Sequence, residues 1–125
     1  MENQERRKYL FMCLVGQNRS PTAARVARDL VDSINADEDD ARNLDISMHY
    51  NGICLVRKRE DKMDYLAGFE RYFVMMEEMR DELVDLGIDR KKIECLYLDD
   101  IYGREDKDLV RRLEASLKVC FLDVK

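Results

Sequence analysis

The fold of this chain is decided by the segment Lys8-Tyr-Leu-Phe-Met-Cys-Leu-Val-Gly-Gln-Asn-Arg-Ser-Pro-Thr22. Residues 9–14 form an apolar run of the kind that makes a short buried strand. Pro21 follows at a position suited to the first residue of a helix, with Ser20 before it as the expected N-cap. The segment therefore predicts a strand, a tight loop and a helix in immediate succession.

Cys13 and Arg19 stand at the two ends of the predicted loop. A strand-loop-helix connection directs backbone N–H groups and the positive end of the helix dipole toward one point. A thiol and a guanidinium at that point would place a nucleophile beside an anion of phosphate size. Gly16 permits the sharp turn, including a left-handed backbone conformation. The loop thus predicts an anion site with a reactive cysteine.

The rest of the chain alternates between strand and helix patterns. Further strands are predicted at residues 44–50, 71–76 and 93–98, and helices at residues 21–35, 60–67, 77–86 and after an N-cap at Asp106. Such alternation implies an α/β fold in three layers, with a four-stranded parallel sheet and helices on both faces. Ligands of such sheets bind at the carboxyl ends of the strands, so the Cys13 loop and the loop 99–105 should meet there.

Length and composition limit the classes of function. The 125 residues are enough for a single domain, residues 1–125, with its own core, and residues 1–7 are expected to form a flexible tail. A net charge of −5 argues against general binding to nucleic acid or to anionic membranes, so a phosphate site would be a local pocket. Apolar runs fall short of the roughly 18 residues that span a bilayer, and the charged N-terminus lacks a signal-peptide core. A cytoplasmic location is expected.

The four cysteines are scattered along the chain, at Cys13, Cys54, Cys95 and Cys120. No two of them form a close pair, and none clusters with the single histidine, His49, so neither a zinc site nor another cofactor is predicted. Reduced thiols are expected, because nothing marks the chain for secretion. The three cysteines outside the loop are expected to be ordinary buried residues.

Phosphoryl transfer to Cys13 would need a partner acid. The leaving group must be protonated, and the phosphorylated enzyme must then be attacked by an activated water; one carboxyl group can serve both steps. Asp99 and Asp100 are the candidates, and the proximity of two acids can raise the pKa of one of them.

Three motifs in order resemble those of the low-molecular-weight protein tyrosine phosphatase family. They are Phe11-Met-Cys-Leu-x4-Arg-Ser-Pro21, Phe73-Val-Met-Met-Glu77 and Asp100-Ile-Tyr-Gly103. The resemblance implies that Cys13 is the nucleophile, Arg19 the phosphate clamp and Ser20 a hydrogen-bond donor to the thiolate. It matches Asp100, rather than Asp99, to the family's acid. It also implies that Tyr102 lines the entrance, and that the phosphate is bound by the backbone N–H groups of Leu14, Val15, Gly16, Gln17 and Asn18.

The chain departs from the family pattern at several positions. Gly16 replaces the usual loop asparagine, and Asn18 replaces the second loop cysteine of many members, which removes their local disulfide. Ile101 replaces the proline after the acid, and Tyr102 stands alone where two tyrosines are usual. Residues 17–20 also resemble the loop of serine phosphatases that act on the carboxy-terminal domain of RNA polymerase. These departures leave the choice between phosphotyrosine and phosphoserine open.

The resemblance predicts a cysteine-dependent, metal-independent phosphomonoesterase, a protein tyrosine phosphatase that works through a phosphocysteine intermediate. Its substrate would be a phosphotyrosine-containing protein or a small aryl phosphate. One alternative is a thioredoxin-coupled arsenate reductase, which would need further cysteines to relay a disulfide from Cys13. Another is a non-catalytic phosphate-binding module in which Asp100 is misplaced. A purely structural role for Cys13 and Arg19 is disfavoured, because a buried arginine still needs an anionic partner. The sequence does not predict an oligomeric state.

Overall fold

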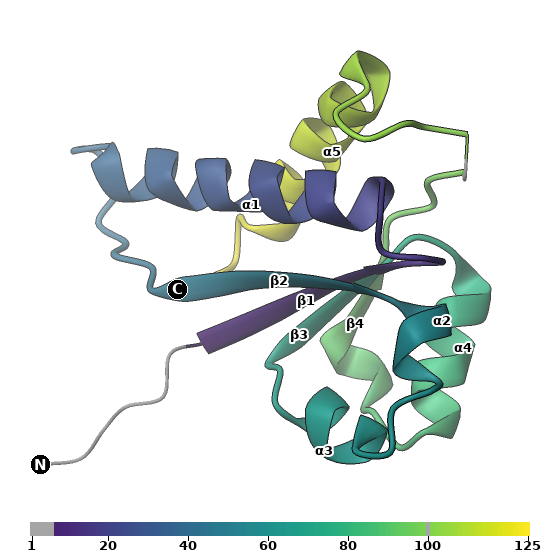
Figure 1. Ribbon diagram of the computed structural model, residues 1–125. Helices are drawn as coiled ribbons and strands as arrows, with labels where there is room; N and C mark the ends of the chain where they lie inside the picture. The colour runs from purple at the N-terminus through teal and green to yellow at the C-terminus, as the bar shows by residue number, and fades with distance from the viewer. Residues whose placement is uncertain (1–6, 100) are drawn as a thin grey trace, which may run out of the picture.

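The computed structural model describes residues 7–99 and 101–125 (Figure 1). Strands and helices alternate along it in the predicted manner. The elements are β1 (Arg7–Cys13), α1 (Arg19–Ala36), β2 (Ile46–Gly52), α2 (Ile53–Val56), α3 (Lys62–Ala67), β3 (Arg71–Val74), α4 (Glu77–Asp85), the 3-10 helix η1 (Arg90–Lys92), β4 (Ile93–Cys95) and α5 (Lys107–Cys120).

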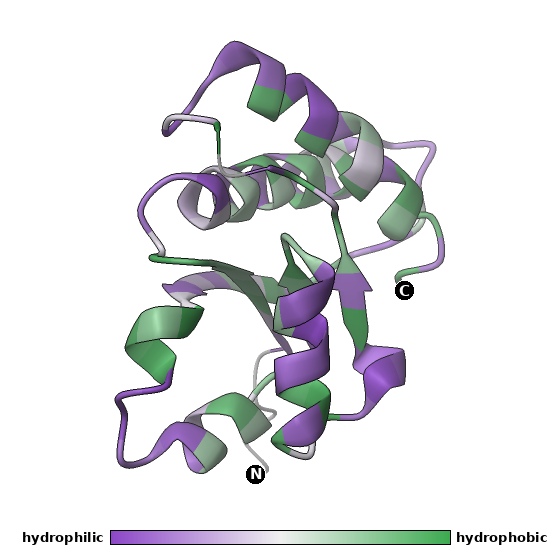
Figure 2. Ribbon diagram, turned by 90° about the vertical axis from the view of Figure 1, so that its right-hand side faces the viewer, coloured by the Kyte–Doolittle hydropathy of each residue, from purple (hydrophilic) through white to green (hydrophobic). Residues whose placement is uncertain are grey.

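The four strands form one parallel sheet in the order β2-β1-β3-β4. Helices α1 and α5 cover one face of this sheet, and α2, α3 and α4 lie on the other (Figures 1 and 2). The predicted three-layer α/β fold is confirmed. After β1 the chain passes first to β2 on one side and then to β3 on the other. The carboxyl end of β1 is therefore the switch point at which parallel sheets of this kind bind ligands.

The core is built around β1, whose residues Tyr9, Leu10, Phe11 and Met12 are fully buried. A strand covered on both faces needs such a continuous apolar run. The ring of Phe11 stacks on Phe73 of β3 with centroids 4.6 Å apart, and the ring of Tyr9 meets Phe121 edge-on at 5.8 Å. Since Phe121 directly follows α5, these rings attach the last helix to the sheet. Figure 2 shows the central strand in green, whereas the helices alternate between green and purple.

The start of α1 differs from the prediction. The helix begins at Arg19, and Asn18, not Ser20, occupies the N-cap position, without a capping hydrogen bond from its side chain. The hydroxyl of Ser20 instead faces the thiol of Cys13. The prediction was wrong because the helix begins one residue before Ser20, so the Ser20 side chain lies in the first helical turn and contacts Cys13 instead of capping the helix.

Strand boundaries also shift. Strand β2 begins and ends two residues later than the predicted range 44–50, and α2, which follows it, was not predicted. Strands β3 and β4 end at Val74 and Cys95, earlier than predicted. Beyond these points the backbone still makes sheet-like contacts, since the N–H of Leu96 donates to the carbonyl of Val74 at 2.8 Å. The apolar runs are therefore longer than the regular ladders.

Two other expectations are corrected. Arg7 belongs to β1 and not to a flexible tail; its Nε donates to Oε2 of Glu70 at 2.7 Å, and residues 1–6 lie outside the described residues. Cys54, Cys95 and Cys120 carry free thiols as expected, but they are only half-buried. Cys95 ends the edge strand β4 and Cys120 ends α5, and such positions have fewer covering neighbours than the sheet centre.

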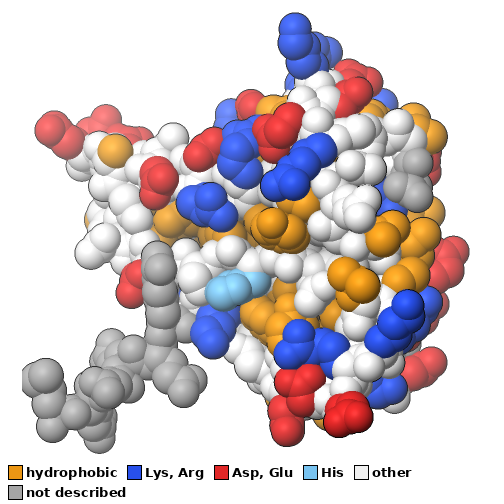
Figure 3. Space-filling model, viewed as in Figure 1, with side chains coloured by type: hydrophobic (Ala, Val, Ile, Leu, Met, Phe, Trp, Pro, Cys, Tyr) orange, Lys and Arg blue, Asp and Glu red, His pale blue; other side chains and the backbone are white. Residues whose placement is uncertain are grey.

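Positive and negative side chains are interspersed over the face shown in Figure 3, with apolar side chains across its middle near β2. This distribution suits the expectation that any phosphate site is local and not part of a basic face. Within residues 7–99 and 101–125, none of the helices combines the length and the apolar character needed to cross a membrane.

The N-cap of α5 generates a first prediction. The carboxylate of Asp106 accepts from the backbone N–H of Asp108 at 2.9 Å and of Leu109 at 3.2 Å, as the sequence predicted. Asp106→Ala should lower the free energy of unfolding by about 1 kcal/mol, because two helix N–H groups lose their acceptor. Asp106→Ser keeps an acceptor and should stay near wild type in urea denaturation. An equal loss in both variants would contradict the capping role.

Candidate active site

The thiol of Cys13 lies at the carboxyl end of the central strand β1. The residue pairs with Gly52 of β2 in the parallel register, and it is only 3% exposed. Beyond it residues 14–18 form a short connection that leads directly into α1. We call residues 13–19 the anion loop. Gly16 adopts a φ of 81°, so the left-handed turn predicted for the loop is present. The fold thus places the cysteine where the chain turns from sheet to helix.

Two hydrogen-bonding groups contact the sulfur. The backbone N–H of Gly16 donates to Sγ of Cys13 at 3.1 Å, and Oγ of Ser20 also lies 3.1 Å from it. Burial opposes ionisation of the thiol, but the hydrogen bonds from the Ser20 side chain, from the Ser20 and Gly16 backbones, and the charge of Arg19 outweigh it. The pKa of Cys13 is therefore lowered. A lowered pKa favours the thiolate, which is the nucleophilic form.

The backbone of the anion loop packs directly against the backbone between β2 and α2. A Cβ added to Gly16 would lie 2.6 Å from the nitrogen of Gly52, and one added to Gly52 would lie 2.2 Å from the carbonyl carbon of Val15. The N–H of Cys54 in α2 donates to the carbonyl of Leu14 at 3.1 Å. These contacts leave no room for side chains at either glycine. The backbone of one turn therefore shapes the other.

Arg19 is the first residue of α1 and is 1% exposed. Its Nη1 donates to the carbonyl of Leu98 at 2.5 Å, which joins the anion loop to the segment that follows β4. A guanidinium stays charged even when buried, so its burial is best compensated by anions and acceptors. Beside Cys13 it is suited to hold a phosphoryl group through two hydrogen bonds.

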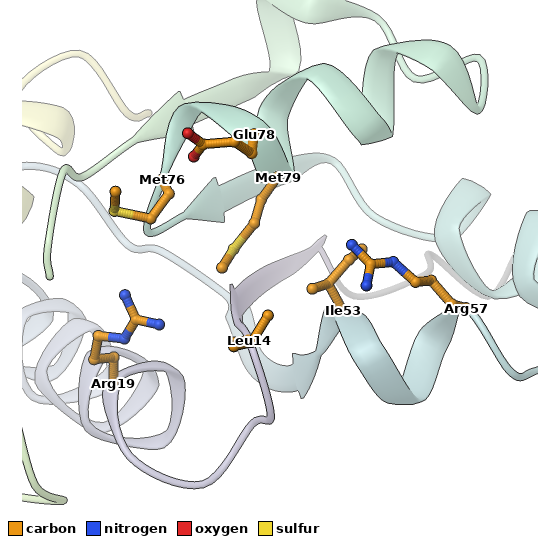
Figure 4. Close-up of a pocket in the computed structure, with 7 residues that line it drawn as sticks. All are labelled: Leu14, Arg19, Ile53, Arg57, Met76, Glu78 and Met79. Carbon is orange, nitrogen blue, oxygen red and sulfur yellow. The ribbon is translucent and has the colours of Figure 1, made fainter. Parts of the chain in front are cut away.

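A cavity of about 220 Å³ opens next to the anion loop (Figure 4). Its walls come from segments that follow β1, β2 and β3 at the same sheet edge, and most of its lining is apolar. The lining residues are Leu14, Arg19, Ile53, Arg57, Met76, Glu78 and Met79. Figure 4 shows the Arg19 side chain on one side of this space and the two methionines above it. The cavity can therefore hold an apolar group attached to an anion bound near Arg19.

Arg57 is held in place at the outer part of this cavity. Its guanidinium contacts both carboxylate oxygens of Glu82 in α4, with Nη2 to Oε1 at 2.5 Å and Nε to Oε2 at 2.7 Å. The pair links the residue that follows α2 to α4. Sequence reasoning did not single out Arg57, and nothing in the neighbouring sequence indicates its partner.

The predicted acid loop lies between β4 and α5. Asp99 is exposed, Tyr102 is half-buried and packs against the core, and Asp100 lies outside the described residues. The backbone N–H of Leu98 donates to the carbonyl of Met75 at 3.0 Å, and Leu98 also receives the Arg19 side chain. The start of this loop is thereby tied to the site. The roles of Asp99, Asp100 and Tyr102 stay predictions.

The loop residues that were expected to bind phosphate differ in exposure. Leu14, Val15, Gln17 and Asn18 are exposed, Gly16 is half-buried, and Ser20 is fully buried. Sequence reasoning missed Gly52, Met79 and Arg57. The Asn51-Gly52 pair was visible as a turn signal, but its contact with Gly16 depends on the register of two strands that are distant in sequence.

Solved structures of several bacterial proteins share this fold. YfkJ from Bacillus subtilis matches 99% of this chain and 99% of its own, with a TM-score of 0.66 and 16% identity. A low molecular weight protein tyrosine phosphatase from Bacillus subtilis matches 94% of this chain and 99% of its own, with a TM-score of 0.63 and 12% identity. For the YwlE arginine phosphatase from Geobacillus stearothermophilus the shares are 95% and 97%, the TM-score is 0.53 and the identity is 16%.

No protein-family model matches the chain, and no curated protein sequence matches it. At the identities of the solved structures the likeness establishes the fold alone. The chain has the fold of low molecular weight protein tyrosine phosphatases over nearly its whole length, and Cys13 stands at the end of the first strand. The resemblance seen in the sequence is thus confirmed in three dimensions.

The contact between the two glycines generates a second prediction. Gly52 has an extended backbone, φ −99°, so alanine is conformationally acceptable there, and the clash with the backbone of Val15 and Gly16 opposes it. Gly52→Ala should lower the free energy of unfolding by about 1–3 kcal/mol, as overpacking does, in urea denaturation. Gly68→Ala is the control, because its Cβ would meet the Tyr65 carbonyl oxygen at an ordinary 3.5 Å. Equal stabilities of the two variants would contradict the close approach.

A third prediction concerns the pH dependence of cysteine alkylation. Iodoacetamide reacts with the thiolate, so the lowered pKa of Cys13 should bring its half-maximal rate below the pH of about 8.5 that is typical of a free thiol. Ser20→Ala removes a donor to the thiolate and should move this midpoint to higher pH. Burial raises the pKa of Cys95 and of Cys120, so these two thiols should react at higher pH in the same sample. Peptide mass spectrometry separates the sites; one common midpoint would refute the assignment.

Proposed function

We propose that this chain is a cysteine-dependent phosphomonoesterase that works through a phosphocysteine intermediate. The observation that carries the proposal is the environment of the Cys13 thiol at the switch point of the sheet. Two hydrogen-bonding groups, the Gly16 N–H and the Ser20 hydroxyl, lie 3.1 Å from the sulfur, and the buried Arg19 begins the helix that follows the loop. A nucleophile and an anion clamp at one point suit attack on the phosphorus of a bound monoester.

In the first step, the thiolate of Cys13 attacks the phosphorus of the bound monoester. The S–P bond forms while the bond from phosphorus to the leaving oxygen breaks, and the leaving oxygen takes a proton from a carboxylic acid. Arg19 and the loop N–H groups stabilise the charge on the transferred phosphoryl oxygens. Asp100 is our candidate for the acid on the strength of the motif resemblance, and Asp99 is the alternative.

In the second step, the same carboxylate takes a proton from a water molecule. That water attacks phosphorus, the S–P bond breaks and inorganic phosphate leaves, which restores the Cys13 thiolate. The scheme calls for no metal ion or cofactor, because the guanidinium and the N–H groups supply the positive charge.

The cavity supports an aryl phosphate as the substrate class, including phosphotyrosine in a protein. Leu14, Ile53, Met76 and Met79 offer apolar contacts to a ring whose phosphate lies near Arg19. A second candidate is phosphoarginine, which the YwlE neighbour is named for. Glu78 favours it, because this carboxylate lines the cavity and could receive a cationic leaving group.

The arrangement of the cysteines disfavours the arsenate reductase alternative. Cys54 follows β2 at one edge of the sheet, whereas Cys95 ends β4 at the other edge. A disulfide relay from Cys13 needs further thiols that can approach one another. Two thiols at opposite sheet edges do not provide such a relay.

The fourth prediction tests the proposal directly. Wild-type protein should hydrolyse 4-nitrophenyl phosphate in EDTA, and Cys13→Ser should abolish the activity. Asp100→Asn should lower kcat by about 100-fold or more, because general acid catalysis is lost, while inhibition by inorganic phosphate stays close to wild type. Asp99→Asn is the matched control and should keep most of the activity.

Other outcomes separate the alternatives. Full activity of Cys13→Ser would end the proposal. Arsenate-dependent oxidation of reduced thioredoxin would establish the reductase, and tight phosphopeptide binding without phosphate release would establish the binding module. Peptides that carry either phosphotyrosine or phosphoarginine, compared by kcat/KM, decide between the two substrate classes.

A further inference from the structure

The loop between β4 and α5 is fastened to helix α1 at both of its ends. At the start, Nη1 of Arg19 donates to the carbonyl of Leu98 at 2.5 Å. At the end, the N–H of Glu105 donates to Oγ1 of Thr22 at 2.9 Å. Nε of Arg25 donates to Oε1 of Glu105 at 2.7 Å. Arg19, Thr22 and Arg25 recur at intervals of three residues, so they lie along one side of α1.

Thr22 joins this loop to the anion loop. Its hydroxyl is fully buried, donates to the carbonyl of Asn18 at 2.9 Å and accepts from Glu105. Asn18 is the last residue before α1, so a single hydroxyl connects the end of the anion loop to the end of the second loop. Both hydrogen-bonding capacities of the buried hydroxyl are used, as a buried polar group requires.

The Arg25 side chain adds a second attachment at the same place. It reaches Glu105 through Nε and Nη2, both at 2.7 Å from Oε1, and its Nη1 lies 2.6 Å from Oδ2 of Asp29. These side chains are partly exposed, and ion pairs of this kind contribute little to global stability. The contact is better suited to holding one loop conformation than to holding the fold together.

The backbone of the loop is strained at its two ends. Within the described part of the chain, Tyr97 and Glu105 are the only non-glycine residues with positive φ, at 54° and 60°. A side chain disfavours this left-handed region, and such conformations persist where surrounding contacts impose them. The two strained residues bracket the segment that carries the candidate acids, and the contacts to Thr22 and Arg25 act on one of them.

We propose that Thr22, Arg25 and Glu105 form a brace that ties the C-terminal end of the loop between β4 and α5 to helix α1. Thr22 and Arg25 are then positioning residues for protonation of the leaving group. The inference rests on the proposed function for its catalytic consequence. An acid must lie within hydrogen-bond reach of the oxygen that it protonates, and displacement by about 1 Å can cost on the order of 100-fold in rate.

The kinetic test uses two substrates that differ in their need for an acid. Phenyl phosphate has a poor leaving group that needs protonation. 4-Nitrophenyl phosphate has a far more acidic phenol as its leaving group, which depends less on an acid. Thr22→Val and Arg25→Gln are the test variants, since neither wild-type residue carries a carboxyl group that could itself be the acid. Thr22→Ser retains the hydroxyl, and Asp29→Asn alters the other partner of Arg25, so these two are the matched controls.

In both test variants, the loss of kcat should be greater for phenyl phosphate than for 4-nitrophenyl phosphate by about tenfold or more. Inhibition by inorganic phosphate should stay near wild type in Arg25→Gln, because the Arg25 side chain contacts Glu105 and Asp29 and not the loop that carries Cys13. Thr22→Ser and Asp29→Asn should behave as wild type. An equal loss of kcat on both substrates in the test variants would overturn the brace. So would a loss in Thr22→Ser as large as that in Thr22→Val.

Hydrogen–deuterium exchange of the inactive Cys13→Ser protein separates this inference from the proposed function. The amide of Glu105 should exchange at least about tenfold faster when Thr22→Val is added, because it loses its acceptor. Unchanged exchange at residues 99–105 would overturn the brace whatever the enzyme does. If Thr22→Val speeds exchange but the wild-type protein hydrolyses neither ester, the result would support the brace and refute the phosphatase.

Discussion

Two backbone turns meet at Gly16 and Gly52 with no space for a side chain between them, and the arrangement of the site depends on that contact. With the β2–α2 turn behind it, the anion loop is held so that the Gly16 N–H points at the Cys13 sulfur. The hydrogen bond from Cys54 to the Leu14 carbonyl holds the first residue of the loop in the same way. Because the backbone of the β2–α2 turn positions the backbone of the anion loop, the anion loop is preorganised.

The electrostatics of the site are local. The chain carries a net charge of −5, yet a buried guanidinium and directed N–H groups gather beside one buried thiol. Burial alone would keep that thiol protonated; the donors from Ser20 and Gly16, with the charge of Arg19, reverse the balance. The same positive groups are those that a phosphoryl group needs. Under the proposed function, one set of contacts both activates the nucleophile and selects the anion.

Helix α1 connects the anion loop to the loop that follows β4. Its first turn carries Arg19 and Ser20 into the anion site, and its next turns carry Thr22 and Arg25 to the loop that follows β4. The helix that contributes Arg19 and Ser20 to the surroundings of Cys13 thus also holds both ends of the loop that follows β4. In this arrangement the geometry of the nucleophile and the geometry of the second loop share one support.

The sequence by itself determined the order of strands and helices, the buried central strand and the placement of Cys13, Gly16 and Arg19 on one loop. These follow from local periodicity and from short-range constraints such as the turn at Gly16 and the cap at Asp106. Only the tertiary structure decided that Gly52 faces Gly16, that Ser20 serves the thiol and not the helix end, and that Thr22 meets Glu105. Each of these contacts joins segments whose spacing is set by strand register and helix packing. A single sequence does not encode such distances locally, because they arise only when the whole core closes.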